Sequence, residues 1–367
     1  MWYCRVVSRK FKIICSDLHL GTGVFEPDGS INILEDFHKD KAFEEFLNHY
    51  SSGEFYDAEV DLILNGDIFD GLKVPFEKYH SPILTEAISL KKFKQIIDGH
   101  PVWFDALRDF AAKENHKISY VVGNHDVEML WESCQAEFKE RVEHPINFYE
   151  YEYNFDGVHV EHGHQHEAIN ALNPKKVFLS QGLKEPIINL PWGSHFVINF
   201  IIPIKKERPV IDKIRPVNAF IRWGMLHDTF WTIKTILKTL TYFLGTRFSK
   251  SLYRTSNLVT TFKILKELQA YQGMWKKARK VLDKRPEFHT VIFGHSHNAV
   301  YKRFDDSKEY LNSGTWTEVV NLNLDRLGKS VRMTYILIDY QKDLTRPRGY
   351  LKEWKGRWHE DVESFMA

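Results

Sequence analysis

The chain has 367 residues, 43% of them hydrophobic, so it can bury a large core and is not expected to be disordered. Its 50 basic and 49 acidic residues nearly cancel, and no global charge imbalance points to nucleic acid. Only Cys4, Cys15 and Cys134 are present, which excludes a CxxC motif and argues against a disulfide framework. The N-terminal residues lack the pattern of a signal peptide, and we expect a cytoplasmic protein.

Short apolar runs that end abruptly in Asp, Asn or His recur five times along the chain. They stop before Asp17, Asp67, Asn124, His162 and His295. Runs of this length and composition are typical of buried strands. The segments between the first four runs have helical character, which we place at 33–50, 81–97, 102–114 and 127–142. This alternation indicates an α/β arrangement with polar residues at the carboxyl ends of strands.

Two later apolar runs, at 309–316 and 332–340, have no helix between them and indicate antiparallel strands or a second sheet. We therefore expect an α/β (α+β) fold, with two stacked mixed sheets flanked by helices and a helical insertion or cap. The predicted boundaries place one discontinuous domain at 1–182 and 274–345, the insertion at 183–273 and a C-terminal tail at 346–367.

The predicted insertion is both basic and apolar. Residues 205–254 contain eleven basic and three acidic side chains. Within it, apolar residues follow helical spacing, while Lys234 and Lys238 fall on another face; the apolar stripe is Phe230, Ile233, Leu237, Leu240 and Leu244. Such a stripe is usually core. The alternatives are a lid over a phosphorylated or lipidic substrate, or a surface that lies on an anionic membrane.

The strand-end motifs are DLH, GDIFD, GNHD, EHGH and GHSH, in that order. Each alone is a weak signal, since such residues also form turns and caps. Together they resemble the calcineurin-like metallophosphoesterase superfamily, whose motifs are DxH, GDxxD, GNH[DE], H and GHxH. The resemblance covers about 11–171 and 287–340, and the family's paired mixed sheets agree with the fold expected above.

The resemblance implies two metal ions that share one carboxylate. Asp17, His19, Asp67 and His297 would hold the first ion, and Asp67, Asn124, His162 and His295 the second. A shared carboxylate places negative charge where two cations repel each other most. Nitrogen and oxygen ligands without thiolate favour a transition metal over calcium, with manganese expected and iron or zinc as alternatives. In the stretch VEHGHQHE, His162 stands directly after its strand run and is the predicted ligand.

The predicted chemistry is phosphoester or phosphoanhydride hydrolysis, by attack of a water that bridges the two ions. His125 follows a ligand and should face the phosphate, where it would stabilise charge or protonate the leaving oxygen. Asp70 or Asp126 would orient it, although each could instead cap a helix. His164 is the predicted substrate contact.

For the substrate we expect a phosphorylated small molecule or a lipid-linked phosphate. The short DLHLG and GDIFD motifs and the helical insertion are similar to the UDP-2,3-diacylglucosamine pyrophosphatase branch of the superfamily. That branch commonly has Arg where this chain has His125, so lipid-linked pyrophosphate cleavage stays an alternative. A nuclease and a non-catalytic scaffold are further alternatives. Balanced charge argues against nucleic acid, and the complete ligand set argues against a scaffold. Peripheral contact with the inner face of a membrane, through the insertion, is a further expectation.

Overall fold

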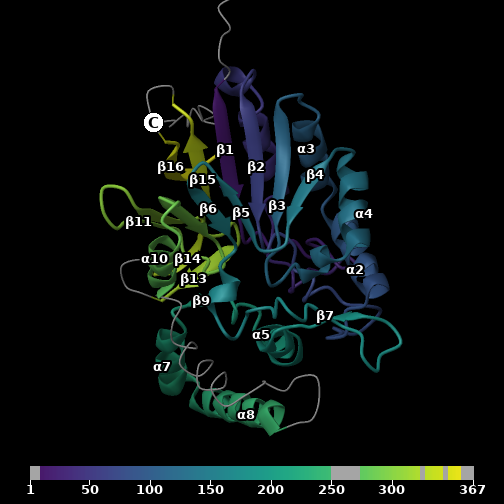
Figure 1. Cartoon of the computed structure of the whole chain (residues 1–367). Helices are drawn as coiled ribbons and strands as arrows, with labels where there is room; N and C mark the ends of the chain where they lie inside the picture. Colours follow the sequence, from purple (N-terminus) through teal and green to yellow (C-terminus); the bar gives the residue numbers. More distant parts are fainter. Residues whose placement is uncertain (1–8, 249–272, 323–326, 342–345, 357–367) are drawn as a thin grey trace, which may run out of the picture.

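The computed structural model describes residues 9–248, 273–322, 327–341 and 346–356. Lys250 and Arg254, counted above among the basic residues of the insertion, lie outside these ranges. Two stacked mixed sheets with helices on their outer faces form the body of the molecule, and part of the insertion lies beyond the carboxyl ends of the central strands (Figure 1). The predicted fold class is confirmed.

The first sheet has six strands in the order β16-β15-β1-β2-β3-β4. Its four parallel strands are β1 (Lys10–Cys15), β2 (Glu59–Asn65), β3 (His116–Val121) and β4 (Ile146–Tyr149). The antiparallel strands β15 (Met333–Asp339) and β16 (Arg348–Trp354) extend it beyond β1. Residues 348–354 lie in the predicted tail, yet they form an edge strand of this sheet.

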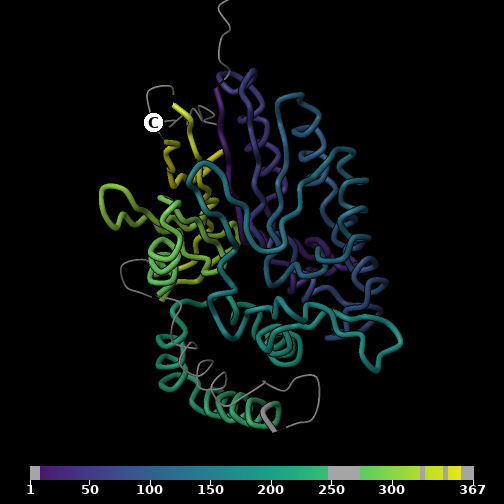
Figure 2. The backbone as a smooth tube through the Cα atoms, viewed as in Figure 1, coloured from purple at the N-terminus to yellow at the C-terminus, as the bar shows by residue number. Residues whose placement is uncertain are grey.

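The second sheet has five strands in the order β11-β12-β10-β6-β5. These are β5 (Glu152–Phe155), β6 (Val158–Glu161), β10 (Thr290–Phe293), β11 (Val300–Arg303) and β12 (Glu309–Asn312). Strands β6, β10 and β12 run parallel. Residues far apart in the chain thus lie side by side in this sheet (Figure 2). The helix α10 (Met274–Lys284) packs on it through Met274, Ala278 and Leu282.

Helices cover the other face of the first sheet. They are α1 (Asp40–His49), α2 (Glu86–Gly99), α3 (Pro101–Ala111) and α4 (Glu132–Val142). The 3₁₀ turn η2 (Val127–Leu130) precedes α4, where a continuous helix had been predicted. Helix α1 begins seven residues later than predicted, because Glu35 accepts hydrogen bonds from backbone N–H groups of the loop before it. Thr85 caps α2, so that helix also begins later than predicted.

Two hydrophobic layers hold the sheets in place. Between the helices and the first sheet lie large aromatic side chains such as Phe43, Phe46 and Trp103. Between the two sheets lie β-branched residues, among them Ile14, Ile63 and Ile292. Lys12 and Asp61 also meet between the sheets, 2.5 Å apart and buried, with the Tyr153 hydroxyl 3.1 Å from each. The central strands are therefore fixed from both faces, which positions their carboxyl ends.

The described part of the insertion is mostly helical. It contains α5 (Trp192–Phe196), the π-helical turn η4 (Val197–Ile201), α6 (Ile202–Glu207), α7 (Val217–His227) and α8 (Thr229–Phe248). The short strands β7 (Phe178–Leu179) and β8 (Ile187–Ile188) pair near its start. Strand β9 (Ile214–Arg215) joins the insertion to β13 (Glu318–Asn321), which pairs with β14 (Gly328–Val331).

Candidate metal centre

The predicted ligands gather at one edge of the paired sheets. Each follows the end of a strand: Asp17 and His19 after β1, Asp67 after β2, Asn124 after β3, His162 after β6, and His295 and His297 after β10. Because these strands are parallel within their sheets, their carboxyl ends meet at a common edge. The strand-to-site relation predicted from the sequence is present in the structure.

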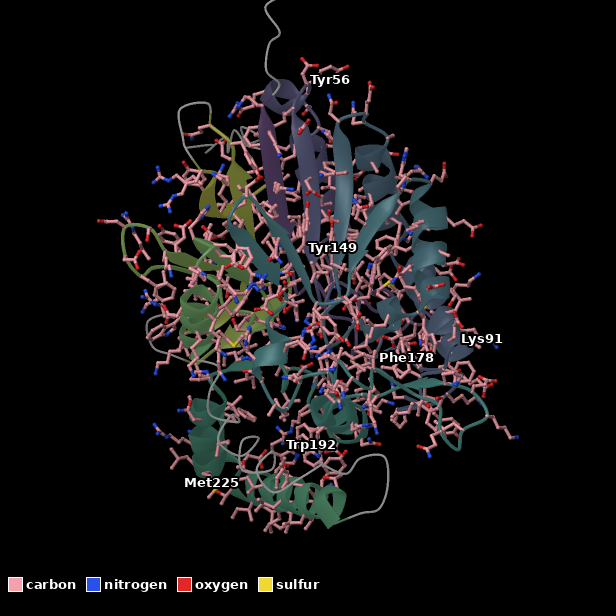
Figure 3. All side chains as sticks on the ribbon, in the orientation of Figure 1. Tyr56, Lys91, Tyr149, Phe178, Trp192 and Met225 are labelled. Atoms are coloured by element: carbon pink, nitrogen blue, oxygen red, sulfur yellow. The ribbon has the colours of Figure 1, made fainter. Side chains whose placement is uncertain are left out.

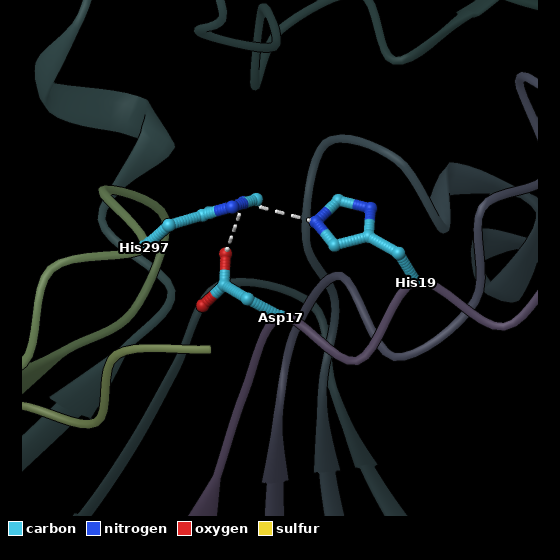
Figure 4. Close-up of side chains that lie close together, drawn as sticks. All are labelled: Asp17, His19 and His297. Carbon is cyan, nitrogen blue, oxygen red and sulfur yellow. Dashed lines mark hydrogen bonds and ion pairs between the residues drawn. The ribbon is translucent and has the colours of Figure 1, made fainter. Parts of the chain in front are cut away.

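One cluster is formed by Asp17, His19 and His297 (Figure 4). His297 Nε2 lies 3.0 Å from His19 Nε2 and 3.3 Å from Asp17 Oδ1. Two imidazole nitrogens and a carboxylate oxygen thus converge on one point. Ligands about 2.1 Å from a common ion would lie roughly 3 to 4 Å apart, so these spacings suit a bound transition metal.

A second cluster is formed by Asp67, His162 and His295, all buried. Asp67 Oδ2 lies 3.1 Å from His162 Nε2 and 3.9 Å from His19 Nε2, so one carboxylate oxygen faces a nitrogen of each cluster. Asn124 Oδ1 is buried and has no hydrogen-bond partner among the described residues. An amide oxygen left in this way costs free energy unless something binds it.

Three of the site histidines are held through the ring nitrogen that points away from their cluster. Asp70 Oδ2 lies 3.1 Å from His19 Nδ1, and the Asn65 carbonyl oxygen lies 2.8 Å from His162 Nδ1. The Glu167 carboxylate lies 2.8 Å from His295 Nε2. Contacts of this kind fix the tautomer and orientation of a metal-binding imidazole. Glu167 was not predicted, and no local pattern in the sequence marks it.

The backbone at the site is strained. Five residues have φ between 52° and 66°, in the left-handed region that residues other than glycine rarely adopt. They are Asp17, His19, Asp67, His295 and His297. Such positions cost about 1–3 kcal/mol each and gather at functional sites. Five of the seven predicted ligands share this feature, which supports a common role.

The histidines of the site also set the charge state of its carboxylates. Burial raises the pKa of Asp17 and of Asp67, but the adjacent His297 and His162 outweigh burial, so both pKa values lie below the usual range. Both carboxylates are therefore ionised, as metal ligands must be. The residue types at the site, carboxylate, histidine and amide, are suited to manganese, iron or zinc.

His125 lies at the more open side of the site, with its side chain 18% exposed. Its Nδ1 lies 3.0 Å from Asp70 Oδ1, and its backbone N–H donates to Asp67 Oδ1 at 2.8 Å. Burial lowers the pKa of His125, but the carboxylates of Asp70 and Asp67 outweigh it and raise the pKa to about 9. The ring is therefore protonated near neutral pH and can donate a hydrogen bond or a proton to a phosphate oxygen.

Asp70, not Asp126, contacts the His125 ring. Asp126 accepts hydrogen bonds from the backbone N–H groups of Ile68 and Gly123 and from the Tyr120 hydroxyl. It therefore ties the loop after β2 to the loop after β3. A role for Asp126 in orienting His125, one of the two readings of the sequence, has no contact to support it in the structure.

His164 is buried in the 3₁₀ turn η3 (His164–His166). Its ring centre lies 5.4 Å from that of His162, and neither ring nitrogen has a hydrogen-bond partner among the described residues. Burial and the neighbouring His162 and His295 hold the pKa of His164 well below its usual value. Contact with a substrate stays a prediction for this ring. His166 instead pairs with Glu161 at 2.6 Å.

A buried set of charges connects Asp70 to the insertion. Lys73 Nζ lies 2.9 Å from Asp70 Oδ2 and also pairs with Asp36. Lys205 Nζ, on α6 of the insertion, lies 2.8 Å from both Asp36 Oδ1 and Asp212 Oδ2. Lys73 contacts Asp70 directly, and the other three residues follow behind it. None of the four was predicted, because only the folded chain brings 36, 73, 205 and 212 together.

Residues 13–214, more than half of the chain, match the family model described as calcineurin-like phosphoesterase. The chain belongs to the calcineurin-like phosphoesterase family. It is a metal-dependent hydrolase that acts on phosphoester bonds. No curated protein sequence matches it.

Solved structures of low sequence identity resemble the chain only loosely. A phosphoesterase of Streptococcus pneumoniae, itself assigned by prediction, is 10% identical, with a TM-score of 0.30 over 97% of this chain and 96% of its own. A dimetal phosphatase of Danio rerio is 9% identical, with a TM-score of 0.34 over 94% and 98%. A calcineurin-like phosphoesterase of Bacillus subtilis is 10% identical, with a TM-score of 0.34 over 94% and 91%. The family assignment rests on the family model, not on these similarities.

Proposed function

We propose that this phosphoesterase works with two divalent transition-metal ions that share Asp67. The supporting observation is the position of Asp67 Oδ2, which lies within 3.9 Å of a nitrogen from each histidine cluster. Asp17, His19 and His297 would complete one site, and Asn124, His162 and His295 the other. When bound, two such ions bind phosphate oxygens and lower the pKa of an attacking water.

The chain's own residues would perform the remaining steps. His125 has its Nδ1 engaged by Asp70, so Nε2 is the nitrogen left for the substrate. As an imidazolium it would donate to a phosphate oxygen or protonate the leaving oxygen. Asp70 holds both His125 and His19, through different oxygens, and thereby fixes the distance between the proton donor and the first cluster.

For the substrate class we propose a phosphorylated small molecule or a lipid-linked phosphate, with cleavage of a UDP-diacylglucosamine-like pyrophosphate as the specific alternative. The apolar outer face of the insertion, described below, favours the lipid-linked form. A hydrolysis screen with manganese added would compare monoesters, diesters, nucleotide diphosphates and lipid-linked pyrophosphates. Preference for a water-soluble monoester over every lipid-linked compound would remove the lipid-linked alternative.

The shared role of Asp67 is tested by Asp67→Asn. An amide keeps the shape but loses the negative charge between two cations, so we expect metal content to fall from about two ions per chain and turnover to drop at least about 100-fold. Elemental analysis and hydrolysis of a nitrophenyl ester measure the two effects. Asp28→Asn, at an exposed loop residue, is the matched control. Full occupancy with unchanged turnover would contradict the proposal.

A further inference from the structure

The helix α8 is amphipathic, but its apolar stripe faces outward and its threonine-rich face is turned toward the protein. Its inner face carries threonines and a few aromatic residues, and Thr232, Phe243 and Thr246 are buried. Its apolar stripe points outward, with Phe230 81% exposed; Ile233, Leu237, Leu240 and Leu244 are exposed as well. The stripe is therefore not part of the hydrophobic core, which was one of the sequence readings. Apolar side chains at this spacing on an outer face indicate that something covers them.

The helix α7 continues the same surface. It packs on α8 at Gly224, where a Cβ would lie 2.4 Å from Thr232 Oγ1, so the two helices approach closely. Leu226 is 78% exposed, and Trp223 and Met225 are exposed on the same helix. Figure 3 shows Met225 at the outer edge of the insertion, away from the sheets, and Trp192 nearer to α8. The exposed Trp223 suits a boundary between water and lipid, whereas Trp192 is buried and donates a hydrogen bond to Thr246 on α8.

The charges on this surface have one sign. Arg222, Lys234 and Lys238 are exposed among the apolar residues. The sequence 217–248 contains a single acidic residue, Asp228, whose carboxylate pairs with Arg208 at 2.5 Å. Basic side chains beside exposed apolar ones are complementary to a surface that is apolar inside and negative at its rim, as an anionic lipid bilayer is.

The surface is also held in a fixed relation to the catalytic edge. In Figure 1 the carboxyl ends of the central strands point toward the side where α5, α7 and α8 lie. The buried Lys205, Asp36 and Lys73 anchor the insertion to Asp70, and β9 pairs with β13. A membrane on the outer face of α7 and α8 would therefore lie on the same side of the molecule as the metal centre.

We propose that the outer face of α7 and α8 docks on an anionic lipid membrane and brings the metal centre to phosphoesters carried by lipids. The substrate part of this proposal rests on the proposed function, whereas docking does not. No helix within the described residues is long and apolar enough to cross a bilayer. The contact is thus made by side chains at the surface of the bilayer, with the apolar stripe inserted and the basic residues at the headgroups.

Docking is tested by flotation of the full chain with vesicles. We expect binding to vesicles of phosphatidylcholine with 30–40% phosphatidylglycerol, roughly, and little binding to phosphatidylcholine alone or at high salt. Phe230→Gln with Leu237→Gln should lower the partition coefficient about tenfold or more. Lys234→Gln with Lys238→Gln should lower it about 25-fold, because each basic residue near such a surface contributes roughly fivefold. Tyr79→Gln and the pair Lys41→Gln with Lys352→Gln, all exposed outside the insertion, are the matched controls.

The results separate docking from catalysis. Hydrolysis of a soluble nitrophenyl ester should be unchanged in the α8 variants, while hydrolysis of a lipid phosphoester in the same vesicles should fall with binding. Loss of soluble activity in Asp67→Asn, with vesicle binding intact, would leave docking standing whatever the fate of the catalytic proposal. No flotation at low salt, or a dimer in sedimentation that Phe230→Gln dissociates, would overturn docking.

Discussion

At the scale of single residues, the site depends on glycines whose lack of a side chain makes space for the ligands. A Cβ on Gly123 would lie 2.3 Å from Asp67 Oδ1, and one on Gly66 would lie 2.5 Å from His162 Nδ1. The absence of a side chain at Gly66 and Gly123 therefore gives Asp67 and His162 room to come together. A single GD or GN pair is weak evidence for a metal site. Several such pairs are stronger evidence when the residues that follow the glycines meet at one edge of the sheets.

The role of His125 as a proton donor is a prediction at the same scale. His125→Gln keeps a hydrogen-bond donor but cannot transfer a proton, so we expect turnover of an alkyl phosphoester to fall about 100-fold. A nitrophenyl ester, whose leaving group needs no proton, should lose far less. The measurement is kcat against leaving-group pKa for both proteins. Losses of the same size across the series would exclude His125 as the acid and leave only charge stabilisation.

At the scale of elements, strand ends could be predicted from the sequence, whereas most helix starts could not. Of the four helices on the first sheet, α3 begins within one residue of its predicted start, and the other three begin five to seven residues late. The runs before Asp17, Asp67 and Asn124 carry their own signal, because burial of a strand shows in four to six consecutive residues. Helix α1 starts only after the loop in which the Glu35 carboxylate accepts hydrogen bonds from the backbone N–H groups of Gly21 and Gly23. Those contacts depend on the folded chain. Glu167, Lys73 and Asp36 escaped prediction for the same reason, since only long-range packing selects them.

We expect the stability of the fold to depend on pH through His100, which lies between α2 and α3. His100 lies 2.8 Å from Asp40 at the start of α1 and 3.3 Å from Glu35. Burial lowers the pKa of His100, but these two carboxylates outweigh it and raise the pKa to about 9. The protonated ring therefore stabilises the fold fully below about pH 6.5, and this contribution is lost as the pH rises through about 9.

The expected size of that contribution is about 3 kcal/mol, from about 1.4 kcal/mol for each pKa unit of difference between folded and unfolded chains. Urea unfolding at pH 6.5 and 9.5 should show it for the natural chain and not for His100→Gln. His38→Gln, at an exposed position, should keep the pH dependence. A steep pH dependence that survives in His100→Gln would assign the effect to other groups.

At the scale of the whole molecule, the insertion and the catalytic domain share one buried charge network. The chain of contacts runs from His125 to Asp70, Lys73, Asp36 and Lys205. Buried ion pairs add little net stability as pairs, but removal of one partner leaves an unpaired charge that costs about 3–5 kcal/mol. The network therefore connects the insertion to the His125 ring by direct contacts.

The coupling is tested at Lys205, which is fully buried and lies outside the metal centre. Lys205→Met leaves Asp36 with Lys73 and Lys213, and leaves Asp212 with Lys73 alone at 3.5 Å. The buried carboxylates then outnumber their close cations, so we expect the free energy of unfolding to fall by about 3 kcal/mol. Hydrogen exchange should rise in α6 and also in the loop that carries Asp70 and Lys73, and kcat should fall with KM little changed. Lys206→Met, at the exposed neighbour, should alter none of these. Faster exchange confined to α6, with kcat intact, would show that the insertion is anchored there without acting on His125.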